Sequence, residues 1–220
     1  MKPIILFGIG DFARIACVYF TADSPYEVAA FTVDESYVEG PELLGKPVVP
    51  FEQLTASHPP DEYSMFVAIG FSGVNKVRRE VYERCKAAGY ELISYVSPRA
   101  QLVADVELGD NCFIFEANVI QPFVQIGNDV VLWSGNHIGH DTKIGDHCFI
   151  ASHVVISGNC TIGASCFVGV NATLRDGVSV GSDCVIGAGA LIMRDTEPGS
   201  VYSVRGTEPL AKKSWELRDF

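Results

Sequence analysis

The fold of the second half of this chain is decided by a stretch that reads Ile138-Gly-His-Asp-Thr-Lys-Ile144-Gly-Asp-His-Cys-Phe-Ile150. An aliphatic residue occupies every sixth position, and the same spacing runs without an insertion from Leu102 to Ile192. Glycine also recurs at intervals of 18 residues, at Gly109, Gly127, Gly145, Gly163 and Gly181. This hexapeptide period predicts a parallel β-helix in which three short strands form one 18-residue coil.

The same repeat accounts for most of the seven cysteines. Positions two before each aliphatic residue are expected to point inward at the coil corners and to suit small side chains. Five cysteines fall at these positions, namely Cys112, Cys148, Cys160, Cys166 and Cys184. Because cysteine is compact and readily buried, we interpret them as core residues rather than as metal or redox groups. Only Cys17 and Cys85 lie outside the repeat.

The first hundred residues alternate between strand and helix patterns. The expected strands are at 2–7, 26–33, 63–69 and 90–96. The expected helices are one that follows the first strand to about residue 21, a short one near 51–54 and a long one at 74–88. This alternation predicts a small parallel sheet with a ligand crevice at the carboxyl ends of its strands. We place the boundary between the two domains near Pro98, which separates residues 1–97 from residues 98–220.

The first predicted strand is followed by a glycine-rich loop, Gly8-Ile-Gly-Asp-Phe-Ala13, and the second strand by Asp34. Such a loop brings backbone N–H groups close to a pyrophosphate at a helix N-terminus. A domain of about 97 residues holds only half of a full dinucleotide fold. The loop therefore favours a nucleotide-sugar site over a nicotinamide site, and a purely structural turn is the third interpretation.

Composition restricts the possible partners. The chain has 220 residues and a formal net charge of −11, which disfavours binding to nucleic acid or to an anionic membrane surface. No apolar run reaches the ~18 residues of a membrane span, and residues 1–20 do not read as a signal peptide. We therefore expect a cytoplasmic protein. An acidic chain that binds anionic substrates must concentrate positive charge or N–H groups locally.

His140 is the strongest catalytic candidate. It lies 18 residues before Gly158, so the two occupy one column of the predicted β-helix, about 4.8 Å apart along the axis. An imidazole suits a general base at neutral pH, and a glycine N–H can stabilise a thioester oxyanion. The alternative is an ordinary surface histidine. No two histidines are 36 residues apart, so we expect no metal site.

The whole chain resembles the bacterial sugar acyltransferases of the sialic acid O-acetyltransferase type, and most of all the nucleotide-linked 4-amino-sugar N-acetyltransferases. The resemblance is carried by these stretches: Leu6-Phe-Gly-Ile-Gly10, Val33-Asp-Glu35, Leu44-Gly-Lys-Pro-Val-Val49, Ala68-Ile-Gly70 with Asn75 and Arg78, Gly139-His-Asp-Thr-Lys-Ile-Gly145, Ser157-Gly158 and Phe167-Val-Gly-Val-Asn171. It implies an α/β Rossmann-like N-terminal domain followed by a left-handed parallel β-helix of hexapeptide repeats. It also implies a homotrimer with acetyl-CoA bound between adjacent β-helices, and transfer to the amine of a nucleotide-linked sugar in glycan biosynthesis.

By position, the resemblance makes His140 the base, Asp141 the supporting carboxylate and Gly158 the N–H donor to the acetyl carbonyl. For CoA it implies Phe149, Gly158, Val170 and Ala188, to which we add Arg205 and Lys212 on grounds of charge. For the nucleotide-sugar it implies Gly8, Gly10, Asp11, Phe12, Asp34, Glu35 and Gly70.

Three positions depart from the family pattern. Asp11-Phe12 stands where many relatives have histidine, Trp133 replaces an asparagine, and Phe149 replaces a second histidine that contacts the cofactor. These changes concern the acceptor pocket more than the chemistry at His140. A sugar O-acetyltransferase of the sialic acid type remains an alternative, as does a non-catalytic nucleotide-sugar-binding trimer. The nucleotide base and the position of the amine are left open.

Overall fold

The computed structural model describes residues 1–103 and 106–216. Its N-terminal part is a five-stranded sheet in the order β3-β4-β2-β1-β5, in which only the β3–β4 pair is antiparallel. The strands are β1 Ile4–Phe7, β2 Val28–Val33, β3 Glu42–Leu43, β4 Lys46–Pro50 and β5 Ser64–Val67. The helical elements are α1 Asp11–Asp23, η1 Glu35–Tyr37, α2 Phe51–Ser57 and α3 Lys76–Ala87. The expected parallel sheet is confirmed, with one added hairpin strand.

The C-terminal part is a parallel β-helix with three sheets, each built from two-residue strands. One sheet, which we call the covered face, consists of β6 Tyr95–Val96, β9 Phe113–Ile114, β12 Val131–Leu132, β15 Phe149–Ile150, β18 Phe167–Val168, β21 Val185–Ile186 and β23 Val201–Tyr202. The open face consists of β7 Gln101–Leu102, β10 Val119–Ile120, β13 His137–Ile138, β16 Val155–Ile156, β19 Thr173–Leu174 and β22 Leu191–Ile192. The polar face consists of β8 Glu107–Leu108, β11 Gln125–Ile126, β14 Lys143–Ile144, β17 Thr161–Ile162 and β20 Ser179–Val180.

The core of the β-helix is the column of aliphatic residues that the sequence period predicts. The five repeat cysteines are fully buried among them, and four donate their S–H groups to carbonyls fifteen residues further along the chain. Every sixth residue from Asn111 to Gly189 has a positive φ and turns a corner of the coil. Asn and Asp fill many of these corners because their short polar side chains tolerate the left-handed conformation.

The expected strand at 90–96 is wrong as one continuous element. Leu92 bridges Met65 at the edge of the N-terminal sheet, whereas Tyr95 and Val96 pair with the β-helix strand β9. The Tyr95 ring stacks on Phe113 with a centroid distance of 4.5 Å. One apolar run therefore serves two sheets, because the chain crosses from one domain to the other within it.

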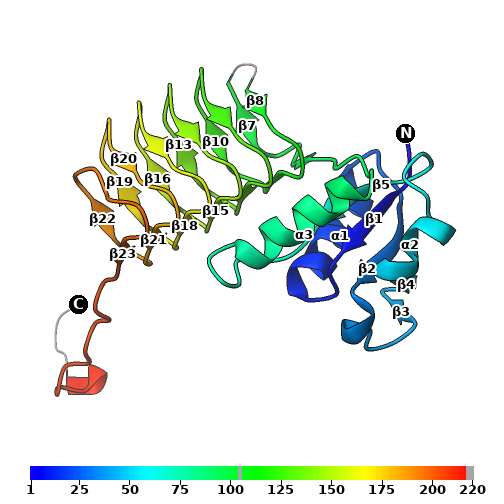
Figure 1. Ribbon diagram of the computed structural model, residues 1–220. Helices are drawn as coiled ribbons and strands as arrows, with labels where there is room; N and C mark the ends of the chain where they lie inside the picture. Colours follow the sequence, from blue (N-terminus) through cyan, green and yellow to red (C-terminus); the bar gives the residue numbers. More distant parts are fainter. Residues whose placement is uncertain (104–105, 217–220) are drawn as a thin grey trace.

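The two domains lie side by side, with α1 and α3 on the side of the N-terminal domain nearest the β-helix (Figure 1). Their contact is largely aromatic: Phe12 and Tyr19 of α1 pack edge-on against Phe113 and Phe115 of the covered face. The described segment after β23 leaves the last coil, contains η2 Ser214–Glu216 and extends away from the rest of the chain.

A buried polar cluster joins α3 to the β-helix. Arg78 and Asp129 are both inaccessible to solvent, and Arg78 Nε lies 3.1 Å from each Asp129 carboxylate oxygen. The Arg78 guanidinium also donates to the carbonyls of Gly70 and His147, and His147 Nδ1 lies 2.9 Å from Asp129 Oδ2. Asn75 donates from α3's N-terminal end to the carbonyl of Cys166. These contacts determine how the N-terminal domain sits on the β-helix.

Candidate active site

The corner between β13 and β14 carries the predicted catalytic pair. His140 Nδ1 lies 2.9 Å from Asp141 Oδ2, and both side chains are about half exposed. Asp141 has φ +57°, so the left-handed turn residue itself supplies the carboxylate. With Nδ1 engaged by Asp141, the other ring nitrogen, Nε2, is the one left to act as a base.

Gly158 lies directly beside this imidazole, as the 18-residue spacing predicts. A Cβ atom at position 158 would lie 2.6 Å from His140 Nε2 and 2.7 Å from its Cε1, so only glycine leaves room for the ring. Among the described residues, the N–H of Gly158 has no hydrogen-bond acceptor. A free N–H beside a histidine base is the arrangement that acyl transfer needs for its oxyanion.

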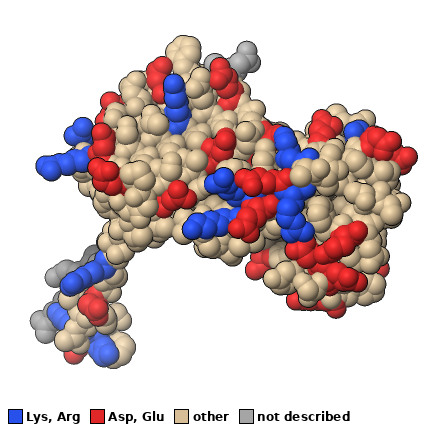
Figure 2. All heavy atoms as spheres, in the orientation of Figure 1, with Lys and Arg blue, Asp and Glu red and all other residues tan. Residues whose placement is uncertain are grey.

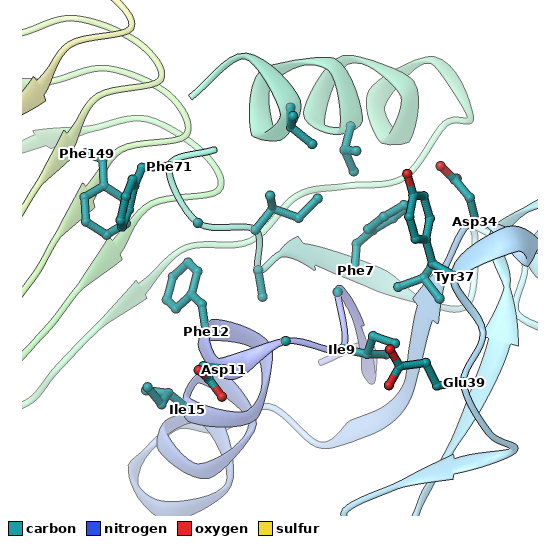
Figure 3. A pocket seen from close by; sticks show the side chains of 18 of the residues that line it. Phe7, Ile9, Asp11, Phe12, Ile15, Asp34, Tyr37, Glu39, Phe71 and Phe149 are labelled. Carbon is teal, nitrogen blue, oxygen red and sulfur yellow. The ribbon is translucent and has the colours of Figure 1, made fainter. Parts of the chain in front are cut away.

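A second candidate site is a cavity of about 650 Å³ at the carboxyl ends of β1, β2 and β5 (Figure 3). The glycine-rich loop forms part of its wall, and Gly8 has φ +128°. A Cβ at Gly8 would lie 2.7 Å from the carbonyl oxygen of Ala68, so the close approach of β1 and β5 requires glycine. The predicted crevice therefore exists at the predicted edge of the sheet.

Six of the seven residues expected to bind the nucleotide-sugar line this cavity, namely Gly8, Gly10, Asp11, Phe12, Asp34 and Gly70. The seventh, Glu35, does not line it; its N–H donates to Glu52 Oε2 at 3.0 Å. Whether these residues bind a nucleotide-sugar stays a prediction.

Asp34 has a partner that the sequence did not reveal. Arg84 of α3 donates to both of its carboxylate oxygens, at 2.5 and 3.1 Å, and the guanidinium lies 5.0 Å from the centre of the Phe51 ring. These hydrogen bonds raise the pKa of Arg84. Arg84 thus holds the Asp34 carboxylate at the edge of the cavity.

The side of the cavity nearest the β-helix is aromatic. Phe71 lies against Phe149, with a centroid distance of 5.1 Å (Figure 3). Trp133 lies between Phe12 and Phe149, with centroid distances of 5.7 and 5.9 Å. Trp133 and Phe149 come from the covered face, so two domains build one cavity. The sequence analysis did not identify Phe71. A signal was available, because Phe149 and Phe167 stand at outward positions of successive coils, and outward aromatic residues indicate a face that another part of the chain covers.

Charge within the cavity is one-sided. Its charged lining residues are Asp11, Asp34 and Glu39, and no basic side chain of the described chain lines it. Acidic side chains also gather over η1 and β3, whereas acidic and basic side chains are mixed over α3 and on the C-terminal segment (Figure 2). A diphosphate in this cavity would have to rely on the backbone N–H groups of the glycine loop.

The residues predicted for CoA are not brought together in one chain. Val170 lies at the corner before β19 and Ala188 at the corner before β22, on the opposite edge of the open face from Gly158. Phe149 is almost fully buried in the cavity wall, and Arg205 and Lys212 lie on the exposed C-terminal segment. The contact of each with CoA stays a prediction.

His140 does not line the cavity of its own chain. The cavity is built on the covered face, whereas His140 follows the open face, so one chain separates the predicted base from the predicted acceptor site. In the described residues no group of three or more His, Cys, Asp or Glu side chains is placed to hold a metal ion. No helix of the described chain is long and apolar enough to cross a membrane.

Comparison with known protein families matches both domains. Residues 3–85 match the PglD N-terminal domain, and residues 118–158 and 159–194 match the bacterial transferase hexapeptide, a unit of six repeats. The chain therefore belongs to the hexapeptide-repeat transferases that carry a PglD N-terminal domain. The expected fold class, a Rossmann-like domain followed by a left-handed parallel β-helix, is confirmed. Among curated proteins, no sequence matches the chain.

Solved structures extend the comparison to particular proteins. PerB from Caulobacter crescentus, in complex with CoA and GDP-perosamine, is 25% identical, covers 91% of this chain and 93% of its own, and has a TM-score of 0.81. The acetyltransferase domain of PglB from Neisseria gonorrhoeae, in complex with acetyl coenzyme A, is 24% identical, covers 95% and 99%, and has a TM-score of 0.82. WeeI from Acinetobacter baumannii AYE is 20% identical, covers 91% and 96%, and has a TM-score of 0.78.

Proposed function

We propose that this protein is an acetyl-CoA-dependent N-acetyltransferase that acts on the amino group of a nucleotide-linked amino sugar in glycan biosynthesis. The observation that carries the proposal is the His140–Asp141 pair beside Gly158 on a hexapeptide coil. Supporting it, the similar PerB structure holds CoA and GDP-perosamine, and the similar PglB domain holds acetyl coenzyme A.

In the proposed mechanism, the sugar amine attacks the acetyl carbonyl while His140 Nε2 accepts a proton from the amine nitrogen. Asp141 stabilises the resulting imidazolium through its contact with Nδ1, and the Gly158 N–H donates to the carbonyl oxygen as it gains negative charge. The C–N bond forms, the C–S bond breaks, and the proton held by His140 passes to the departing CoA sulfur. No covalent intermediate on the enzyme is required.

The acceptor binds in the N-terminal cavity in this proposal. Its pyrophosphate lies against the glycine loop at the N-terminus of α1, where N–H groups and the helix dipole favour an anion. Asp34 and Glu39 present hydrogen-bond acceptors to the N–H and O–H groups of the nucleoside. The aromatic wall offers an apolar surface to the sugar.

The active enzyme is proposed to be a homotrimer. The polar face points Glu107, Lys143 and Ser179 outward, whereas the open face points Val155 and Leu191 outward, and these two aliphatic side chains are 40% and 62% exposed. Packing of open faces between copies would bury this apolar surface. It would also bring His140 of one copy toward Val170 or the cavity of another copy. Such an approach is needed because a single chain holds His140 apart from its own cavity. Because acetyl-CoA is the co-substrate, we infer a cytoplasmic location.

The test is release of thiol from acetyl-CoA by the purified protein with UDP-, dTDP- and GDP-linked amino sugars. The variant His140→Ala is expected to keep the trimer mass in light scattering and to lose about 10²- to 10⁴-fold in turnover, the usual range for a general base. The matched control is His58→Ala, because His58 is a half-buried histidine outside both proposed sites whose Nδ1 is also hydrogen-bonded, here 2.9 Å from Ser57 Oγ.

Undiminished turnover in His140→Ala would contradict the assignment of His140 as the base. Absence of amine-dependent thiol release by the wild type would contradict the proposed function. An alkali-labile product would instead identify an O-acetyl ester, because esters hydrolyse readily and amides do not. A monomeric wild type would contradict the trimer.

A further inference from the structure

A second carboxylate approaches the reacting edge of His140. The corner column at 18-residue spacing continues from His140 and Gly158 to Asp176. The point where a Gly158 Cβ would stand lies 2.6 Å from His140 Nε2 and 3.1 Å from Asp176 Oδ1. Because Gly158 has no side chain, the imidazole and the carboxylate reach toward each other across it, from one coil on each side.

The two groups are close without touching. Neither a hydrogen bond nor an ion pair joins His140 to Asp176 in the described chain, and the only carboxylate that contacts His140 is Asp141, on Nδ1. The distance from Nε2 to Asp176 Oδ1 is therefore longer than a hydrogen bond. It cannot exceed the sum of the two distances from these atoms to the position of a Gly158 Cβ. One hydrogen-bonding atom placed between them can reach both.

Asp176 has no structural task of its own in the described residues. It is exposed, and its carboxylate accepts no hydrogen bond there. Asp195 on the next coil differs, because its Oδ1 accepts a hydrogen bond from the backbone N–H of Ser179 at 2.9 Å. Arg194 follows Asp176 in the same column but forms no ion pair with it among the described residues. An unpaired carboxylate beside a general base is available to a substrate.

We infer that Asp176 binds the acceptor amine and makes the enzyme select an amine over a hydroxyl; this inference rests on the proposed function. An amine nitrogen between the two groups donates one N–H to His140 Nε2 and a second to Asp176. The first proton is transferred to Nε2 as the C–N bond forms, and the second remains on the nitrogen of the amide product. A hydroxyl has only one hydrogen, so it leaves either the base or the carboxylate without a donor.

The experiment compares wild type, Asp176→Asn and the control Asp183→Asn with two acceptors. Both are the same nucleotide-linked sugar, one with the amine and one with a hydroxyl in its place. Asp183 is also an exposed aspartate of the β-helix. It lies at the corner between β20 and β21, outside the column of His140. Thiol release gives kcat and KM for the amine, and competitive inhibition gives the affinity of the hydroxyl analogue.

In Asp176→Asn we expect kcat/KM for the amine to fall about 10- to 100-fold, the range for a lost hydrogen bond to a charged group, with KM for acetyl-CoA unchanged. The preference for binding the amine over the hydroxyl analogue should fall by a similar factor. Asp183→Asn should match the wild type in both.

An unchanged preference in Asp176→Asn, with an active wild type, would overturn the role of Asp176 alone. A wild type that releases no thiol with any amino sugar would overturn the proposed function and this inference together. Equal losses of affinity for the amine and for the hydroxyl analogue would show that Asp176 stabilises the corner of the coil and does not recognise the amine. That result would also overturn the inference.

Discussion

Gly158→Ala provides a direct test of the catalytic corner, because the structure predicts how far the base must move. The new Cβ would lie 2.6 Å from His140 Nε2, whereas ordinary contact begins at 3.4 Å. The imidazole must therefore shift by about 0.8 Å to restore contact distance. The backbone at position 158 is not in the left-handed region, so alanine fits it without strain, and the N–H is retained.

A displacement of about 1 Å in a reacting group costs on the order of 10²-fold in rate. We therefore expect kcat/KM for amine-dependent thiol release to fall about 100-fold in Gly158→Ala, with the melting temperature and the oligomeric mass unchanged. The control is Gly40→Ala, because a Cβ at Gly40 meets no atom within 4 Å.

The double variant His140→Ala/Gly158→Ala separates the two roles of Gly158. Alanine keeps the N–H, and its methyl group presses hardest on the imidazole, with Asp176 Oδ1 next at 3.1 Å. Most of the loss should therefore act through His140, so the double variant should be only slightly slower than His140→Ala. Wild-type activity in Gly158→Ala, or a further hundredfold loss in the double variant, would refute the proposed action of Gly158 through His140.

Two further predictions concern the fold that positions the site. Arg78→Met leaves the buried Asp129 carboxylate without its guanidinium partner, with only His147 and Asn111 beside it. Unfolding in urea, followed by Trp133 fluorescence at the domain contact, should show a loss of about 3–5 kcal/mol. Arg78→Met/Asp129→Asn should recover part of it, because asparagine removes the buried charge and tolerates the left-handed backbone of position 129. An unchanged stability in the single variant would show that the buried pair does not join the domains. Burial raises the pKa of Cys85 and of Cys112 to about 12, so these groups are neutral thiols across the physiological range. A thiol reagent should label the folded protein very slowly and all seven cysteines after denaturation, and rapid labelling at pH 8 would contradict their burial.

The catalytic corner could be predicted from the sequence because a β-helix converts sequence spacing directly into position. Residues 18 apart occupy one column, so His140 and Gly158 had to be neighbours once the period was read. The same rule extends to Asp176, whose approach needs the actual side-chain directions to be seen. The cavity was predictable in outline, since the glycine loop and Asp34 end adjacent parallel strands.

The partners of these residues were not predictable, because they depend on contacts between segments far apart in the chain. Arg84 reaches Asp34 from a helix 50 residues further on, and Phe71 meets Phe149 only because the domains dock. Phe149 illustrates the difference: position in the repeat marks it as an outward residue, but only docking shows that it faces the N-terminal cavity.

What the sequence alone determined is thus the part of the molecule governed by a regular period: the coils, the buried cysteines and the column that holds His140 and Gly158. Each depends on local backbone geometry repeated every six residues, which a linear pattern encodes completely. Only the tertiary structure decided how the N-terminal domain lies on the covered face, through Arg78, Asp129 and the aromatic contacts. Side-chain pairing across such an interface depends on shape and on exact register, and the same residues in the linear sequence are compatible with many dockings.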